Sequence, residues 1–121
     1  MSHTYHRVVK AQEMADRSLQ GFIVNRWPVV IVKDEGKLHA LINRCSHQAA
    51  SFTPDGRVRR GAIMCPLHGA RFKLDNGECM GATGYSALMR FDLREDAEGW
   101  IEVAVPDAAP GHEHLPVTPL G

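Results

Sequence analysis

The sequence lacks the features that mark a membrane, secreted or nucleic-acid-binding protein. Among its 121 residues, 14 basic side chains balance 14 acidic ones, so the net charge gives no basis for binding nucleic acid or an anionic membrane. The longest apolar run, Trp27 to Val32, is far too short to cross a bilayer. The opening residues, MSHTYHRVVK, lack the basic and apolar regions of a secretion signal. A soluble cytoplasmic protein is the simplest interpretation.

The chain is also poor in cysteine, with only Cys45, Cys65 and Cys79. An odd number does not suit a disulfide framework, and a reducing compartment keeps thiols reduced. Cysteines in such a protein bind metal, take part in catalysis, or are simply buried. Cys79 follows a predicted turn and is interpreted as a small buried residue, which leaves Cys45 and Cys65 as candidates for chemistry.

Long helical patterns are absent, and turn signals recur throughout the chain. Period-two alternation, β-branched residues and Gly-bearing turns predict strands. Tight hairpin turns are predicted at Asp34-Glu35-Gly36 and Asp75-Asn76-Gly77, because Asn and Gly tolerate the positive φ that such turns require. At most one helical turn is expected, within residues 12–18. The predicted strands cover residues 5–9, 21–25, 29–33, 38–42, 61–64, 70–74, 78–81, 88–93 and 100–105.

These short strands predict an all-β fold, an antiparallel sandwich or small barrel. The chain is too short for a second domain with a core of its own. The alternation stops after Val105, and the rest of the chain contains four prolines, which predicts an extended tail along the surface. The expected organisation is one domain over residues 1–105 and a Pro-rich C-terminal tail over residues 106–121.

Two short segments each combine one cysteine with one histidine. In Cys45-Ser46-His47 the thiol and the imidazole are two residues apart, on the same face of an extended chain. Cys65-Pro66-Leu67-His68-Gly69 has the composition of a tight turn, with proline fixing one φ and glycine freeing the exit. Each segment follows a predicted strand, so a rigid sheet is expected to present both loops, residues 43–52 and 64–72, together.

Two thiolates and two imidazoles suit zinc or iron. A closed Cys2His2 zinc site usually takes its ligands from pairs grouped by type, C-x2-4-C and H-x3-5-H. Here each loop supplies one of each kind. The mixed pairing favours a two-iron cluster, with thiolates on one iron and imidazoles on the other, over a zinc-stabilised interaction module without redox function.

The pattern C-x-H, seventeen residues, then C-x2-H-G resembles the Rieske [2Fe-2S] signature. The likeness covers about residues 5–105, through "GKLHALINRCSH" around the first loop and "GAIMCPLHGARFKLDNGEC" around the second. It implies that Cys45 and Cys65 bind the inner iron of a [2Fe-2S] cluster, and that His47 and His68 bind the outer iron near the surface. It also implies an antiparallel β core with a small cluster-binding subdomain.

Departures from the respiratory members of that family predict a low reduction potential. Those members have hydroxyl residues where this chain has Ala70 and Phe72, and a loop-bridging cysteine where it has Leu67. Hydroxyl donors to the cluster sulfurs favour the reduced state, so their absence predicts a potential near the lower end of the Rieske range, roughly −150 mV. The third loop, Gly81 to Tyr85, lacks the proline that covers the cluster in many members, and Tyr85 is a candidate for supplying that bulk.

The resemblance implies a monomeric ferredoxin without a catalytic site. It would carry one electron at a time from an NAD(P)H-dependent reductase to the terminal oxygenase of a ring-hydroxylating system. The alternative within the family is the small subunit of an NADH-dependent nitrite reductase. A docking face is predicted around Gln48, Leu67 and residues 81–85. The run Arg57-Val58-Arg59-Arg60 is interpreted as a solvated strand or turn rather than a patch for an acidic partner.

Overall fold

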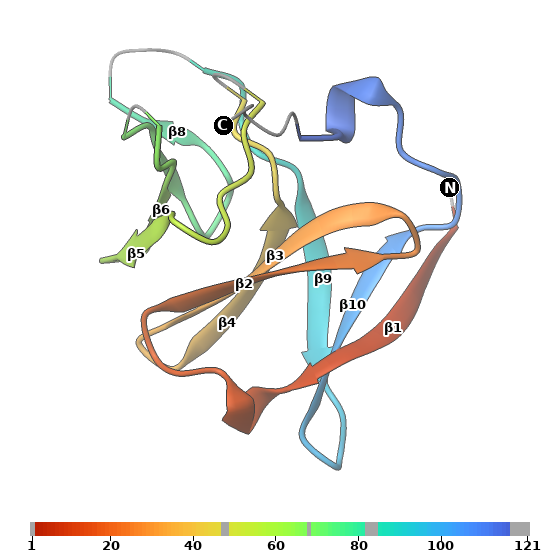
Figure 1. The fold of residues 1–121 in the computed structure, drawn as a ribbon. Helices are drawn as coiled ribbons and strands as arrows, with labels where there is room; N and C mark the ends of the chain where they lie inside the picture. Colours follow the sequence, from red (N-terminus) through yellow and green to blue (C-terminus); the bar gives the residue numbers. More distant parts are fainter. Residues whose placement is uncertain (1, 47–48, 68, 82–84, 117–121) are drawn as a thin grey trace.

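The computed structural model describes residues 2–46, 49–67, 69–81 and 85–116, which form an all-β fold (Figure 1). Its elements are β1 His3–Lys10, η1 Ala11–Glu13, β2 Ser18–Val24, β3 Trp27–Asp34, β4 Lys37–Ile42, β5 Arg57–Arg59, β6 Ala62–Met64, β7 Arg71–Lys73, β8 Cys79–Met80, β9 Arg90–Glu95, β10 Trp100–Pro106 and η2 His112–His114, where η marks a 3-10 helix.

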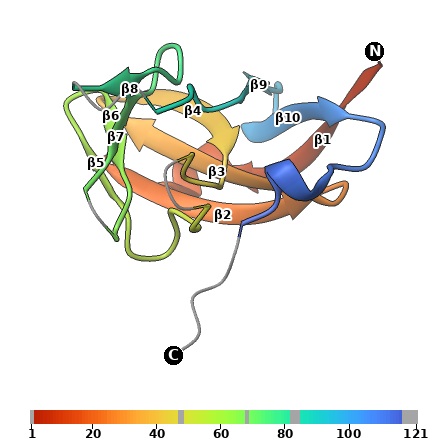
Figure 2. The ribbon, with the colours of Figure 1, turned by 90° about the horizontal axis from the view of Figure 1, so that it is seen from above.

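The strands form two antiparallel sheets. The larger sheet has the order β1-β10-β9-β4-β3-β2, and the smaller has the order β5-β6-β7-β8. The larger sheet curls on itself, and the smaller one covers one end of the molecule (Figure 2). The predicted class, an antiparallel β fold with a small subdomain, is confirmed.

Each predicted strand has a counterpart, and the structure adds β5, from the arginine run after residue 56. Glu35 and Gly36 both have positive φ, 52° and 79°, as a two-residue hairpin between β3 and β4 requires. Gly77, at φ 79°, closes the predicted turn between β7 and β8. The helical turn expected within residues 12–18 is instead a 3-10 turn at Ala11–Glu13.

Strand β3 forms the centre of the core. Its residues are buried almost without interruption, and Val29, Val30, Ile31 and Val32 have no exposed surface. A strand that is buried on both faces has a continuous run of apolar residues in its sequence instead of alternating apolar and polar residues. Strand β3 lies between β4 and β2 in the curled larger sheet (Figures 1 and 2).

The inner face of the smaller sheet packs on the core. Val58, Ile63 and Phe72 are paired across β5, β6 and β7, are buried, and face the shared core. Phe72 meets Phe52 edge to face, with ring centroids 5.9 Å apart. A hydrogen bond from the Gly61 amide to Asp34 Oδ2, 2.7 Å long, connects the β5–β6 turn to the end of β3. The two sheets therefore share one core and do not form separate units.

The segment after β10 lies against the larger sheet. The Trp27 indole Nε1 donates to the Ala108 carbonyl at 2.9 Å, and the His114 ring lies 5.0 Å from the Trp27 ring. Arg44, next to the first cysteine loop, donates through Nε to the Leu115 carbonyl at 3.2 Å. The described part of the predicted tail thus lies along the surface, but it contains the 3-10 helix η2, which was not predicted.

Candidate metal centre

The two cysteine loops have the same backbone frame. The Cys45 amide donates to the Ala50 carbonyl at 2.8 Å, and the Cys45 carbonyl accepts from the Ala49 amide at 2.7 Å. In the second loop, the Cys65 amide donates to Ala70 at 2.8 Å, and its carbonyl accepts from Gly69 at 3.1 Å. In both loops the partners are therefore five and four residues beyond the cysteine. The frame is shared although the Cys/His spacings differ.

Both frames place a positive φ at the same position. Ala49 has φ 58° and Gly69 has φ 71°, each four residues after its cysteine. Glycine adopts this conformation at no steric cost, whereas an L-alanine pays roughly 1–2 kcal/mol. The first loop thus holds a strained residue where the second has a glycine, which indicates that the loop geometry is imposed by its surroundings.

The Cys45 and Cys65 side chains are buried, with 0% and 3% of their surface exposed. Each lies just beyond a strand, after β4 and after β6, and each belongs to the main hydrophobic cluster. All three cysteines are described, and each is a thiol instead of half of a disulfide. Two buried thiols in matched loops fit the thiolate half of a two-iron cluster. Cys79, half-buried in β8, lies outside these loops.

The imidazole half of the predicted site stays a prediction. His47, His68 and Gln48 lie outside the described residues, as do 82–84 of the third loop. Within the described ranges, no group of three or more His, Cys, Asp or Glu side chains is arranged to hold a metal ion. Leu67, beside His68, is exposed to 45%.

Asn43 holds the first loop from within the core. It is 6% exposed, and its side-chain Oδ1 accepts from the Phe52 amide at 2.8 Å. Its Nδ2 donates to Thr53 Oγ1 at 2.9 Å. Asn43 precedes residues 44–51 and its two partners follow them, so one amide side chain closes this part of the loop at its base. Sequence reasoning missed this role, because a single Asn after a strand carries no distinctive pattern.

Ser46 connects the first loop to the segment after the third. Its hydroxyl donates to the Ser86 carbonyl at 2.6 Å. Tyr85, the next residue back, is half-buried and packs against the core cluster, as expected if it helps to cover the loops. The described parts of the loops after β4, β6 and β8 gather at one end of the molecule, at the top of Figure 1.

Comparison with known proteins identifies the family of this chain. Residues 4–92 match the family described as the Rieske [2Fe-2S] domain. The chain belongs to this family. The cofactor of the domain is a [2Fe-2S] cluster, and the matched residues include both Cys/His segments. Among the described residues, no helix is long and apolar enough to cross a membrane.

Two curated relatives show how widely this domain is used. Mouse apoptosis-inducing factor 3 is 36% identical over 70 residues, which are 58% of this chain and only 11% of that protein. This Rieske domain is therefore a small part of some of its relatives. The ferredoxin component of the naphthalene 1,2-dioxygenase system of Pseudomonas aeruginosa is 29% identical over 82 residues, which are 68% of this chain and 78% of that protein.

Solved structures of ferredoxins from dioxygenase systems have a similar fold. The ferredoxin of carbazole 1,9a-dioxygenase from Nocardioides aromaticivorans IC177 superimposes with a TM-score of 0.74 at 27% identity, over 89% of this chain and 99% of that chain. A ferredoxin chain solved in complex with the carbazole 1,9a-dioxygenase oxygenase has a TM-score of 0.75 at 24% identity, covering 83% and 92%. Over most of its length, the chain is therefore similar to the ferredoxins of carbazole and naphthalene dioxygenase systems.

Proposed function

We propose that Cys45 and Cys65 hold one iron of the cluster and that His47 and His68 hold the other. The observation that carries this assignment is the shared frame of the two loops, which presents two buried thiols from equivalent positions. The histidines follow from their spacing to those thiols. When bound, the cluster accepts and returns one electron, and its imidazole ligands make it easier to reduce than an all-thiolate cluster.

The chain's own residues tune and protect such a cluster. Because Cys45 and Cys65 are buried, the iron that they would hold is shielded from water. Asn43 fixes the first loop through two hydrogen bonds. Phe72 is fully buried, and Ala70 offers only its backbone carbonyl, to Cys65. Neither side chain can donate a hydroxyl hydrogen bond, which supports a potential near the lower end of the Rieske range, roughly −150 mV.

The proposed role is that of a one-electron carrier between an NAD(P)H-dependent reductase and the terminal oxygenase of a ring-hydroxylating system. Its likeness over most of its length to dioxygenase ferredoxins supports this role. We propose that residues 1–105 form the working domain and 106–121 its tail, and that the protein acts as a cytoplasmic monomer. Exposed Leu67, together with Gln48 and residues 81–85, remains the proposed face for electron exit.

The ligand assignment is tested with matched cysteine variants. Cys45→Ser and Cys65→Ser should each lower iron and acid-labile sulfide to near background, because serine is a poor ligand for this cluster. Cys79→Ser changes the same atom in the half-buried strand β8 and should retain the visible absorbance of the native protein. A Cys45→Ser protein that keeps its full iron content would reject the assignment.

The partner assignment is tested by reconstitution. The purified protein is combined with a flavin reductase and the terminal oxygenase of a ring-hydroxylating system, and NADH-dependent product formation is measured. Product formation should require this chain. Charge-neutral changes at Leu67 should alter the rates of cluster reduction or oxidation, and unchanged rates with both partners would remove Leu67 from the docking face. Turnover only with a large nitrite reductase subunit would favour the alternative family member.

A further inference from the structure

The outer face of the smaller sheet carries a row of arginine and methionine side chains. Strand pairing sets Arg57 opposite Met64, Met64 opposite Arg71, and Arg71 opposite Met80. Residues directly opposite in paired strands point to the same face of the sheet. The inner partners of this row are the buried Val58, Ile63 and Phe72, so the row itself faces outward. The strand register thus places Arg71 on the same face as Arg57, in the run that the sequence indicates to be a solvated strand or turn.

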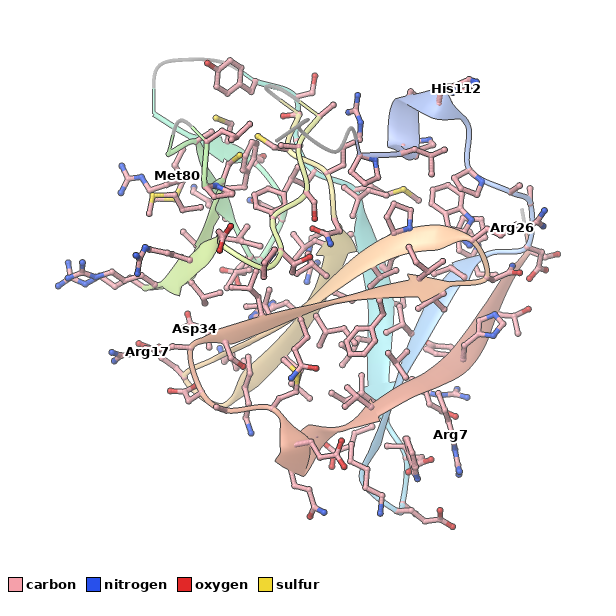
Figure 3. The ribbon with its side chains drawn as sticks, in the orientation of Figure 1. Arg7, Arg17, Arg26, Asp34, Met80 and His112 are labelled. Atoms are coloured by element: carbon pink, nitrogen blue, oxygen red, sulfur yellow. The ribbon has the colours of Figure 1, made fainter. Side chains whose placement is uncertain are left out.

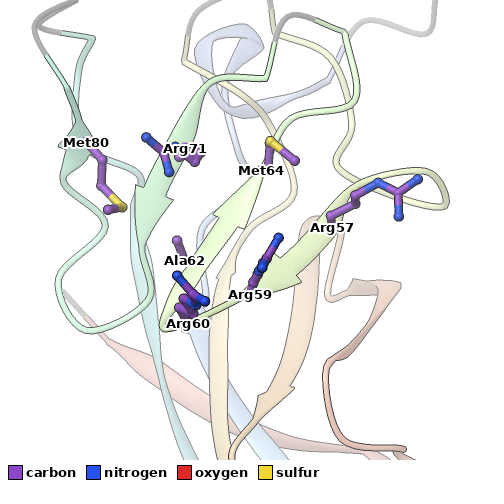
Figure 4. Close-up of a pocket in the computed structure, with 7 residues that line it drawn as sticks. All are labelled: Arg57, Arg59, Arg60, Ala62, Met64, Arg71 and Met80. Atoms are coloured by element: carbon purple, nitrogen blue, oxygen red, sulfur yellow. The ribbon is translucent and has the colours of Figure 1, made fainter.

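These side chains line a pocket of about 380 Å³ on the outer face (Figure 4). Its cationic walls are exposed and come from Arg57, Arg59, Arg60 and Arg71. Its floor is apolar, with Ala62 buried and Met64 and Met80 half-buried. We refer to these seven residues as the arginine face. No aromatic side chain is among them.

Among the described residues, the arginine face has no anionic partner. The ion pairs found among the described residues involve Arg7, Arg94 and His114, none of which lies on this face. Lys73 adds a further cation on β7. Its neighbour across the turn, Glu78, forms no ion pair within the described part of the chain, and the same holds for Asp55 and Asp75 in the flanking turns. Within the part of the chain that the structure describes, four guanidinium groups therefore have no ion-pair partner and can bind an external anion.

We propose that the arginine face binds an acidic surface patch on a protein with which this ferredoxin exchanges electrons. The proposal rests on the proposed carrier function and names the chemistry of one partner. Arginine and methionine are enriched at protein interfaces, and guanidinium groups bind carboxylates in a bidentate manner. Methionine on the floor can adapt to more than one partner surface.

Composition argues against two other polyanions. A nucleic-acid-binding domain usually has a strong basic excess, whereas this chain has a formal net charge of 0. A face that inserts into an anionic membrane surface usually presents large aliphatic or aromatic residues, and none lines this one. A localised positive patch on a neutral chain orients a charged protein partner as it approaches.

The position of the arginine face connects it to the cluster loops. Strand β6 ends at Met64, directly before Cys65, and β7 begins at Arg71, after the second loop. Strand β8 ends at Met80, where the third loop starts. A partner held by these strands is therefore held beside the loops through which the electron must pass. This face is distinct from Leu67 on the second loop.

The test measures binding of a fluorescein-labelled poly-L-glutamate peptide to the cluster-loaded protein by anisotropy. The variants are Arg57→Glu/Arg71→Glu, the charge-removing Arg57→Gln/Arg71→Gln, and the control Arg26→Glu. Arg26 is an exposed arginine in the β2–β3 turn, on the opposite side of the molecule from Met80 (Figure 3). Single-stranded DNA and phosphatidylglycerol vesicles serve as competing polyanions. Circular dichroism and visible absorbance verify folding and cluster content of each variant.

The native protein and Arg26→Glu should bind the peptide equally, and binding should weaken with added salt. The Arg57→Glu/Arg71→Glu variant should lose about tenfold or more in affinity, with the glutamine pair in between. Equal binding by the native protein and the double variant would overturn the proposal, and so would tighter binding of DNA or vesicles than of the peptide. Peptide binding does not depend on redox activity, so loss of the carrier role in reconstitution would be a separate result.

Discussion

Replacing Asn43 by alanine should destabilise the first cysteine loop more than the small loss of side-chain volume suggests. The substitution removes two hydrogen bonds. In the first, the Phe52 amide donates to Asn43 Oδ1 at 2.8 Å, and no other described side chain accepts from this amide. In the second, Asn43 Nδ2 donates to Thr53 Oγ1 at 2.9 Å. Phe52 is fully buried, so its amide cannot turn to water for a replacement. We therefore expect a buried backbone donor without a partner.

A buried polar group left without its hydrogen bond costs about 1–3 kcal/mol. Taking about 2 kcal/mol, and assuming that this contact is lost before the unfolding transition state, the unfolding rate should rise about 30-fold. The kinetic quantity is the suitable one here, because loss of a cluster makes unfolding irreversible.

The assay follows the loss of visible absorbance and of the far-ultraviolet circular dichroism signal after a jump into urea. Asn76→Ala is the matched control. Asn76 also accepts from a backbone amide, that of Glu78 at 2.9 Å, but this bond is exposed and water can replace it. The control should change the rate less than about threefold. Equal rates for Asn43→Ala and the native protein would refute the reasoning, since the loop would then not depend on this side chain.

Three further predictions concern the turns, the pH dependence and the potential. Gly77→Ala should prevent soluble expression or lower the melting temperature strongly, because the new Cβ would overlap the Leu88 carbonyl. Gly36 has the same φ of 79° but open space around it, so Gly36→Ala should lower the stability by only about 1 kcal/mol. Equal losses of stability in the two variants would contradict the steric argument. Burial, and next the charge of Arg90, lower the pKa of His39, so the folded protein favours the neutral ring. Stability should then be full above the unfolded pKa of about 6.5 and fall as the pH drops through the folded value, and His39→Gln should flatten this dependence in urea titrations at different pH; an unchanged slope would exclude His39 as the cause. Protein-film voltammetry should give a midpoint near −150 mV, and a value close to +300 mV would show that the hydroxyl-free positions 70 and 72 do not set the potential.

The strands could be predicted because their apolar periodicity is local. For β5 the sequence predicted only a solvated strand or turn, without deciding between the two. Its three residues include only Val58 as an apolar side chain, so no period can be read from it, and pairing with β6 is what makes it a strand. The helix η2 was likewise missed. It lies in a Pro-rich segment without alternation, where Trp27 and Arg44 supply contacts from elements distant in the sequence.

The site was predictable in its chemistry and less so in its geometry. Residue spacing alone pointed to the Cys/His loops, since metal ligation restricts residue types strongly. The positive φ of Ala49 could not be anticipated, because alanine rarely adopts it, and the match to Gly69 became visible only from the backbone geometry of the two loops. The Ser46–Ser86 bond joins residues forty positions apart and left no signal in either segment. His47 and His68 remain predictions, as they lie outside the described residues.

Electron paramagnetic resonance of the dithionite-reduced protein tests the central claim most directly. Mixed ligation, with thiolates on one iron and imidazoles on the other, predicts a [2Fe-2S] signal whose average g-value lies below that of an all-thiolate cluster. In protein grown with 15N-labelled histidine, pulsed spectra should show coupling to two nitrogens. A colourless protein that contains zinc and gives no such signal, or a cluster without nitrogen coupling, would contradict the account.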